Sequence, residues 1–294
     1  MAENNNTQKD VDDFTGVETT GHEWDGIKEL NNPLPRWWLI VFYATVIWSL
    51  VYWVLMPAWP GIAGYTKGVR NHSERENVAV QMAALNEERA AATQQLIEAP
   101  SLQAIENDAN LLQFAMAAGE SLFGDNCATC HGAGGQGFAG YPSLVDDAWL
   151  WGGKLEDIQQ TLHYGIRSGH PETRFNMMMA YGRDNLLPRE QISDLTEYVV
   201  ALSGREADAA AVERAEPVFQ QQCASCHGAD GVGVQALGAP NLTDAIWLYG
   251  GERETIHETI YEGRGGVMPA WTDRLGDDQI IALAVYVHAL GGGE

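Results

Sequence analysis

The sequence repeats one short motif, at residues 127–131 (CATCH) and again at residues 223–227 (CASCH), and these hold all 4 cysteines of the chain. Two thiols at this spacing can form thioether bonds to the haem vinyl groups, and the adjacent imidazole can then ligate the iron. A redox dithiol or a zinc site with four thiolates would also use CxxC, but neither needs a histidine in that place. We therefore predict two covalently bound haem c groups. The predicted attachment residues are Cys127, Cys130, Cys223 and Cys226, and the predicted axial histidines are His131 and His227.

The sequence around the motif is repeated too. Residues 119–137 (GESLFGDNCATCHGAGGQG) match residues 215–233 (AEPVFQQQCASCHGADGVG), and residues 195–204 (LTEYVVALSG) match residues 283–292 (LAVYVHALGG). A copy of about 85–95 residues is small for a self-sufficient core, and a haem would supply the missing apolar centre. Each copy is expected to have a helix leading into the motif, a Gly-rich loop, a central helix and a closing helix. The closing helices are predicted over 188–202 and 277–290.

An uncharged stretch of 20 residues, Trp37–Met56, precedes the repeats. At about 1.5 Å per residue it spans about 30 Å, the thickness of a bilayer hydrocarbon core. Thirty-six mostly polar residues come before it, which favours an uncleaved anchor over a signal peptide. Lys and Arg on the two sides do not settle the orientation, but covalent haem attachment takes place on the outer face of the energy-conserving membrane. We therefore expect a single-pass bacterial inner-membrane protein with a cytoplasmic N-terminus and periplasmic haem domains.

The predicted fold class is all-α: one N-terminal transmembrane helix followed by two tandem class I cytochrome c domains. The expected boundaries are 1–36 (cytoplasmic, with 1–20 disordered), 37–56 (span), 57–107 (periplasmic linker with a helix over 73–97), 108–204 (first cytochrome c domain) and 205–294 (second cytochrome c domain). The formal net charge of −23 argues against a nucleic-acid partner, because phosphates would be repelled from most of the surface.

Methionines supply the second axial ligand in this interpretation, because a thioether sulfur raises the potential of a haem iron. In the second copy Met268, followed by Pro269, is the candidate. The first copy offers Met177, Met178 and Met179, and aligning the flanking Ala and aromatic residues selects Met178. Met177 and Met179 are the alternatives for that site. Bis-histidine ligation is less favoured; its candidates would be His163, His170, His257 and His288.

Two arginines precede the methionines. Arg167 and Arg264 are predicted at equivalent places, where a guanidinium could pair with a haem propionate or simply be solvated. Large aromatic residues near the middle of each copy could line the haem crevice or pack in the core. They are Trp149, Trp151, Trp247 and Tyr249.

The run GHEWDGIKELNNPLPRWW at 21–38, the single anchor and the two CxxCH modules together resemble the dihaem subunit (CcoP/FixP type) of cbb3-type cytochrome c oxidase. The resemblance implies an electron-entry subunit that takes electrons from a donor cytochrome c. It would pass them toward a monohaem cytochrome c subunit and a haem–copper catalytic subunit, which reduces oxygen to water and pumps protons. Where this family usually has Met-Pro at the first haem, the chain has Met178-Met179.

The residues alone indicate a membrane-anchored, periplasmic dihaem electron carrier. The competing classes are a free-standing electron shuttle, a dihaem peroxidase and a haem-based gas sensor. Peroxidase and sensor chemistry need an open iron, so a methionine available to each haem argues against both.

Overall fold

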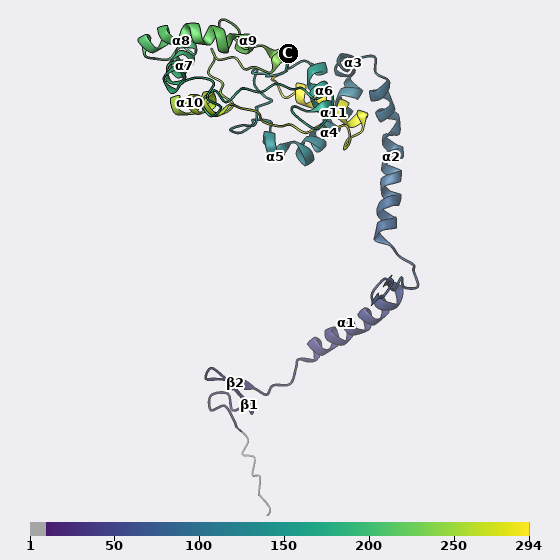
Figure 1. The fold of residues 1–294 in the computed structure, drawn as a ribbon. Coiled ribbons are helices and arrows are strands. Elements are labelled where there is room, and N and C mark those ends of the chain that lie inside the picture. Colours follow the sequence, from purple (N-terminus) through teal and green to yellow (C-terminus); the bar gives the residue numbers. More distant parts are fainter. Residues whose placement is uncertain (1–9, 294) are drawn as a thin grey trace, which may run out of the picture. The chain divides into compact units, whose positions relative to one another are not determined.

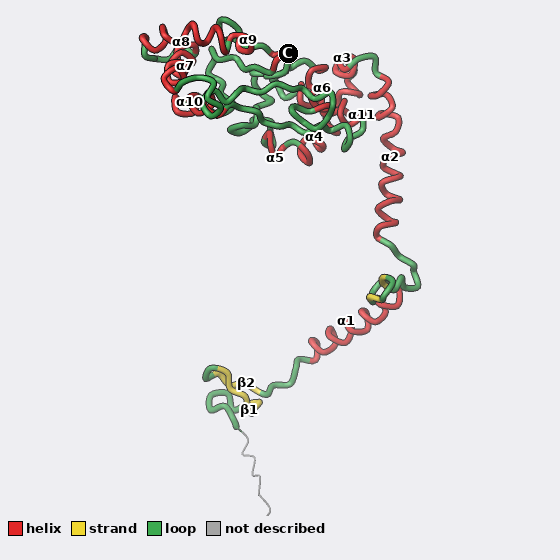
Figure 2. The backbone as a smooth tube through the Cα atoms, viewed as in Figure 1, coloured by secondary structure: helices red, strands yellow, loops and turns green. Residues whose placement is uncertain are grey.

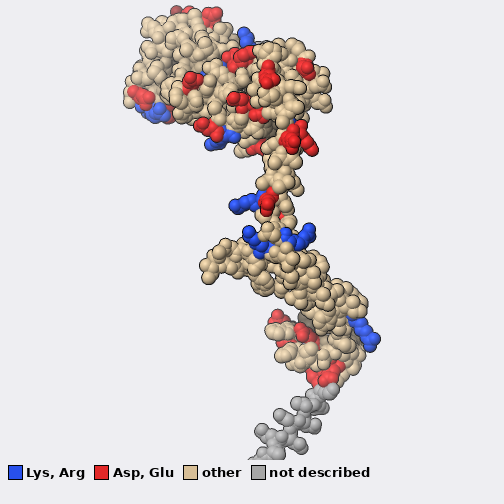
Figure 3. All heavy atoms as spheres, turned by 90° about the vertical axis from the view of Figure 1, so that its right-hand side faces the viewer, with Lys and Arg blue, Asp and Glu red and all other residues tan. Residues whose placement is uncertain are grey.

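The computed structural model describes residues 10–293, and the chain divides into two units, Met1–Leu85 and Asn86–Glu294 (Figure 1). The first unit contains α1 (Arg36–Leu55), which among the described residues is the one helix long and apolar enough to cross a membrane. It follows Pro35 and ends before Pro57, where the sequence predicts the span. The segment after α1 contains Lys67, Arg70 and Arg75, and Figure 3 shows a group of Lys and Arg side chains.

A β-hairpin precedes the span, formed by β1 (Thr19–Trp24) and β2 (Ile27–Leu30). Asp25 and Gly26 form its turn with φ of 50° and 85°, as the Asp-Gly dipeptide favours. The ammonium of Lys28 and the hydroxyl of Thr19 both donate to the Asp10 carboxylate, at 2.9 and 2.8 Å. The expectation of disorder over 1–20 is therefore wrong for residues 10–20, while residues 1–9 lie outside the described part. The turn dipeptide was the signal for a hairpin that the sequence analysis did not predict.

A short hairpin of β3 (Pro60–Gly61) and β4 (Gly64–Tyr65) follows the span, and α2 (Glu74–Glu98) comes next. The predicted helix over 73–97 thus begins and ends one residue later. The Ser73 hydroxyl accepts from the Glu76 N–H at 3.4 Å, so Ser73 caps the helix as expected.

The second unit is helical, and loops connect its helices (Figure 2). Asp108 and Asp208 accept from the first backbone N–H groups of α4 and α8, so these helices begin at matching caps in the two copies. The elements are α3 (Leu102–Asn107), α4 (Ala109–Asn126), α5 (Ala128–His131), α6 (Leu155–Tyr164), α7 (Arg189–Leu202), α8 (Ala209–Gln222), α9 (Ala224–His227), the 3₁₀ helix η1 (Gln235–Leu237), α10 (Arg253–Glu262) and α11 (Asp277–His288).

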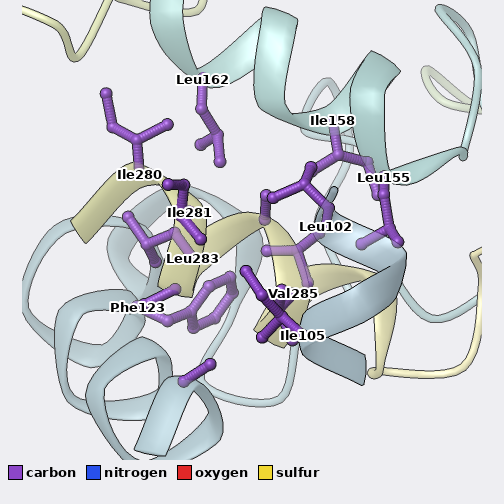
Figure 4. Close-up of a cluster of buried hydrophobic side chains, with 14 of the residues drawn as sticks. Leu102, Ile105, Phe123, Leu155, Ile158, Leu162, Ile280, Ile281, Leu283 and Val285 are labelled. Atoms are coloured by element: carbon purple, nitrogen blue, oxygen red, sulfur yellow. The ribbon is translucent and has the colours of Figure 1, made fainter. Parts of the chain in front are cut away.

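The closing helices are exchanged between the two copies. Helix α11, from the second copy, packs against α3, α4 and α6 of the first, so that Leu283 shares a core with Phe123 and Leu162 (Figure 4). Helix α7, from the first copy, packs against α8 and α10 of the second, where Leu195 shares a core with Phe219. In Figure 1 the yellow α11 accordingly lies beside the teal helices α4 and α6.

Two lobes result. The split lobe joins residues 96–166 to residues 268–290, whereas the continuous lobe runs from 178 to 264 without interruption. The predicted boundaries 108–204 and 205–294 delimit the two sequence copies, and the packed lobes cross them. The physical reason is that both closing helices carry the same apolar spacing, so local pattern alone cannot say which copy each one covers.

Candidate haem sites

Each CxxCH motif begins with a cysteine that ends a long helix, and its other four residues form a one-turn helix. The N–H of Cys127 donates to Phe123 O at 2.8 Å, and the N–H of His131 donates to Cys127 O at 2.9 Å. The equivalent bonds at Cys223 and His227 measure 2.8 and 3.0 Å. The backbone therefore presents two cysteines and a histidine in the same way twice.

The two histidines are oriented by the same contact. The imidazole Nδ1 of His131 lies 2.9 Å from Pro142 O, and that of His227 lies 3.1 Å from Pro240 O. A carbonyl only accepts, so Nδ1 donates and Nε2 keeps a lone pair for a metal. Burial lowers the pKa of both histidines, which favours the neutral imidazole that ligation needs.

The cysteine environment does not suit redox or zinc chemistry. Burial raises the pKa of the Cys127 and Cys223 thiols to about 11, whereas a reactive dithiol needs a lowered pKa. All four cysteines are free, and within residues 10–293 no group of three or more His, Cys, Asp or Glu side chains could hold a metal ion. The described part of the chain therefore does not bring the two CxxC pairs together as a four-thiolate zinc site would require.

Like the closing helices, each methionine lies in the lobe that holds the CxxCH motif of the other copy. A cavity of about 250 Å³ is lined by Cys223, Cys226 and His227 of the second copy together with Met178 of the first. Met268, from the second copy, packs against the split-lobe core, which includes Cys127. From the sequence, Met178 and Met268 were each expected to bind the haem of their own copy. The structure instead brings Met178 to His227 and Met268 to the motif of His131.

Backbone pairing makes Met178 and Met268 equivalent. Met268 pairs with Ile166 beyond α6, and Met178 pairs with Arg264 beyond α10, through two backbone bonds in each case. The side chains of Met177 and Met179 on either side are 53% and 50% exposed, whereas Met178 is only partly exposed and packs on the core.

Two glycines allow this close approach. Gly165 and Gly263 end α6 and α10 with φ of 71° and 72°, a conformation that favours glycine. A Cβ at either position would overlap the carbonyl oxygen of Met268 or Met178 respectively. These glycines were missed as site residues, although the Tyr-Gly and Glu-Gly pairs at the ends of the central helices were a visible signal.

The two arginines are not at equivalent places, contrary to expectation. Since Gly165 matches Gly263, Arg264 corresponds to Ile166 and Arg167 has no arginine counterpart. Both arginines line the cavity at His227. The Arg264 guanidinium lies 4.5 Å from the ring centroid of Tyr249 and donates to the Thr259 hydroxyl.

The aromatic candidates divide between the lobes. Trp247 and Tyr249 line the cavity at His227, whereas the Trp149 indole donates to Gly292 O and Trp151 packs against Gly238. The alternative histidines are engaged elsewhere: His288 pairs with Glu106 and the His163 ring contacts the Thr272 hydroxyl. Neither they nor His170 and His257 line this cavity.

Together these residues define a class of protein. The cavity offers two thiols, a neutral imidazole and a thioether within a largely apolar lining, which is the donor set that a covalently held haem requires. The split lobe repeats the same four residue types. The fold and the two sites are those of a dihaem c-type cytochrome.

Comparisons with known proteins narrow the class to a family. Residues 16–63 match the model for the N-terminal domain of cytochrome oxidase-cbb3, FixP; residues 116–203 match cytochrome c; residues 210–287 match cytochrome c oxidase, cbb3-type, subunit III. The chain is 51% identical to the cbb3-type cytochrome c oxidase subunit CcoP of Azospirillum brasilense, covering 98% of this chain and 99% of the relative. It is 52% identical to subunit FixP of Bradyrhizobium sp. (strain ORS 278), covering 97% and 98%.

A third relative, subunit CcoP of Cereibacter sphaeroides, is 50% identical over 94% of this chain and 95% of its own. The chain therefore belongs to the CcoP/FixP family of cbb3-type cytochrome c oxidase subunits. Its cofactors are two covalently bound haem c groups, and its role is that of an electron-transfer subunit of the oxidase rather than a free-standing shuttle.

Proposed function

We propose that this chain is the electron-entry subunit of a cbb3-type oxidase, accepting electrons from a donor cytochrome c. It passes them to a monohaem cytochrome c subunit and the haem–copper catalytic subunit, which reduces oxygen to water and pumps protons. The observation that carries this proposal is the pair of equivalent Cys–Cys–His–Met sets within one unit. When bound, each haem would supply one-electron redox chemistry, and the two cysteines, the histidine and the methionine of each set would hold it.

Within this proposal each residue has a distinct role. Cys127 and Cys130 tether one haem and Cys223 and Cys226 the other, while Pro142 and Pro240 orient the two ligating imidazoles. The exchanged packing supports His131 with Met268 at one iron and His227 with Met178 at the other. Arg264, on the cavity wall, is placed to compensate a propionate of the second haem.

The ligand pairing is tested in chains that carry a single haem. Cys223→Ser with Cys226→Ser leaves only the haem at His131, and its ferric form should keep the weak near-infrared band of Met–Fe ligation. Adding Met268→Ala should abolish that band, while adding Met178→Ala should leave it intact. The opposite result would restore the pairing of each methionine with the histidine of its own copy. No band in the single-haem parent would reject methionine ligation there.

The N-terminal hairpin supports a docking role on the cytoplasmic side of the membrane. The side chains of Trp24 and Ile27 flank its turn and are 67% and 72% exposed, although both are large and apolar. A single tether would need only the apolar length of α1. Hairpin and span also match one family model together, over residues 16–63. We expect the hairpin tip to bind the oxidase core, with the lobes in the periplasm.

Two surface variants test this docking. Trp24→Ser with Ile27→Ser should lower the recovery of the copper-containing membrane complex with this chain, while membrane insertion and both haems persist. Phe14→Ser is the matched control, because Phe14 is 97% exposed and lies outside the hairpin strands. Unchanged recovery for the double variant would reduce the hairpin to a tether.

A further inference from the structure

Arg167 lies on the first of the two segments that cross between the lobes. These segments, residues 166–177 and 264–267, connect α6 to the Met178 loop and α10 to the Met268 loop. Arg167 has φ of 50°, in the left-handed region that an arginine rarely adopts. Such a strained conformation persists only where surrounding contacts hold it.

Those contacts join the two methionine loops. The Arg167 Nε donates to Gly266 O at 2.5 Å, and its Nη1 donates to Asn176 O. Gly266 stands two residues before Met268 and Asn176 stands two residues before Met178. One guanidinium therefore bonds to equivalent carbonyl oxygens on the two crossing segments, just before the Met178 and Met268 loops.

The other copy has no arginine at the matching position, because the residue equivalent to Arg167 there is Gly265. Gly265 takes part in the contact in another way: a Cβ at that position would lie 3.9 Å from the Arg167 side chain. The planar fork of arginine can hold two carbonyls in a fixed relation, which the single ammonium of lysine cannot reproduce. Of the two matching positions, only Arg167 therefore has a side chain that can bond to both crossing segments.

We propose that Arg167 is a positioning residue that holds the two methionine loops together and so sets the potentials of both haems jointly. This rests on the proposed methionine ligation. A fixed positive charge between the loops also disfavours the additional charge of a ferric iron on either side, which raises both potentials. Loss of the guanidinium removes both effects.

The experiment is a redox titration of the full, dihaem protein with Arg167→Gln, followed optically and combined with near-infrared spectra of the ferric form. Both midpoint potentials should shift in the negative direction, and both Met–Fe bands should weaken. Arg167→Lys keeps the charge but not the forked contact, so the bands should stay weakened. Arg183→Gln is the control for charge alone, because Arg183 is an exposed arginine near the Met178 loop, paired with Asp184 and Glu262.

A shift confined to one haem, no shift at all, or full recovery of potentials and bands with Arg167→Lys would each overturn the inference. Equal shifts in Arg167→Gln and Arg183→Gln would do the same, since general charge loss would then explain them. Failure of the ligation itself is separate: the parent protein would then lack one or both Met–Fe bands before any change at Arg167.

Discussion

The closing helices α7 and α11 are equivalent by sequence but have adapted to different surroundings. When Leu195 is aligned with Leu283, Asp194 and Glu197 of α7 fall opposite Ala282 and Val285 of α11. Ala282 and Val285 are fully buried, in a core that also includes Leu96, Leu102 and Ile105 from the segment before the first copy. That preceding segment has no counterpart in the continuous lobe.

On α7 the same positions carry ion pairs instead. Asp194 binds Arg214 of α8 at 2.6 Å, and Glu197 binds Arg253 at the start of α10 at 2.7 Å. The two helices therefore cannot be interchanged, although they satisfy the same local pattern. The difference indicates that the exchanged arrangement is encoded in side chains suited to each lobe.

The largest effect is expected when a buried residue of α11 is replaced by the charged residue found at the matching position of α7. Val285→Glu places an unpaired carboxylate in the split-lobe core, at a cost of about 3–5 kcal/mol. The reciprocal change, Glu197→Val, breaks the ion pair with Arg253 and the hydrogen bond from the Asp208 N–H, and should cost about 1–2 kcal/mol. Thermal denaturation of the holoprotein, followed by each Met–Fe band, measures both. Similar losses in the two variants would mean that α7 and α11 occupy equivalent environments, against the structure.

The next effect concerns the glycines that bring each methionine loop against its central helix. Gly165→Ala combines left-handed strain of about 1–3 kcal/mol with a clash against Met268 O, so the haem at His131 should lose its methionine band. Gly263→Ala should do the same to the haem at His227. Each variant is read in the chain that carries only the haem in question.

Gly204→Ala supplies the control for these glycines. Gly204 has φ of 73°, but a Cβ added there would meet nothing within 4 Å, so the substitution carries the strain without the clash. Both bands should survive this change. If Gly165→Ala left the band at His131 intact, the backbone pairing between Ile166 and Met268 would not position the ligand of the split lobe.

The smallest effect is a difference in acid sensitivity between the lobes. Hydrogen bonds from Arg214 and Arg253 hold the pKa of Asp194 and Glu197 below their ordinary values of 3.8 and 4.5. A carboxyl group whose pKa is lowered in the folded state stabilises the fold at pH values above its ordinary pKa. That contribution is lost as the pH falls through the pKa of the folded state. Below about pH 4.5 the continuous lobe should thus lose up to about 1 kcal/mol per pair, a loss absent at Ala282 and Val285.

Asp194→Asn with Glu197→Gln tests this component. In this variant the continuous lobe, followed by its Met178–Fe band, should unfold at a lower temperature at pH 7. Its unfolding temperature should also depend less on pH in acid, and unfolding followed by the Met268–Fe band should not change. An unchanged acid dependence of the continuous lobe would assign the effect to other groups.

The sequence by itself determined the chemistry of the two sites and the elements that carry them. The two CxxCH motifs, the span before them and the closing helices are local patterns, each readable within about twenty residues. The choice of Met178 over its neighbours also came from local alignment, and its equivalence to Met268 is visible in the backbone pairing. The missed hairpin at Thr19–Leu30 was local as well, since its Asp-Gly turn was present in the sequence.

Only the tertiary structure decided which closing helix packs on which copy and which methionine lines the cavity at His227. Both copies satisfy the same helical spacing and the same turn chemistry, so no local rule distinguishes Met178 with His131 from Met178 with His227. The choice depends on contacts between residues far apart in the chain, such as Leu283 with Phe123. It also depends on what covers each helix, as the ion pairs of α7 and the buried face of α11 show. Packing and chain connectivity act over these distances, and the sequence pattern within one copy does not record them.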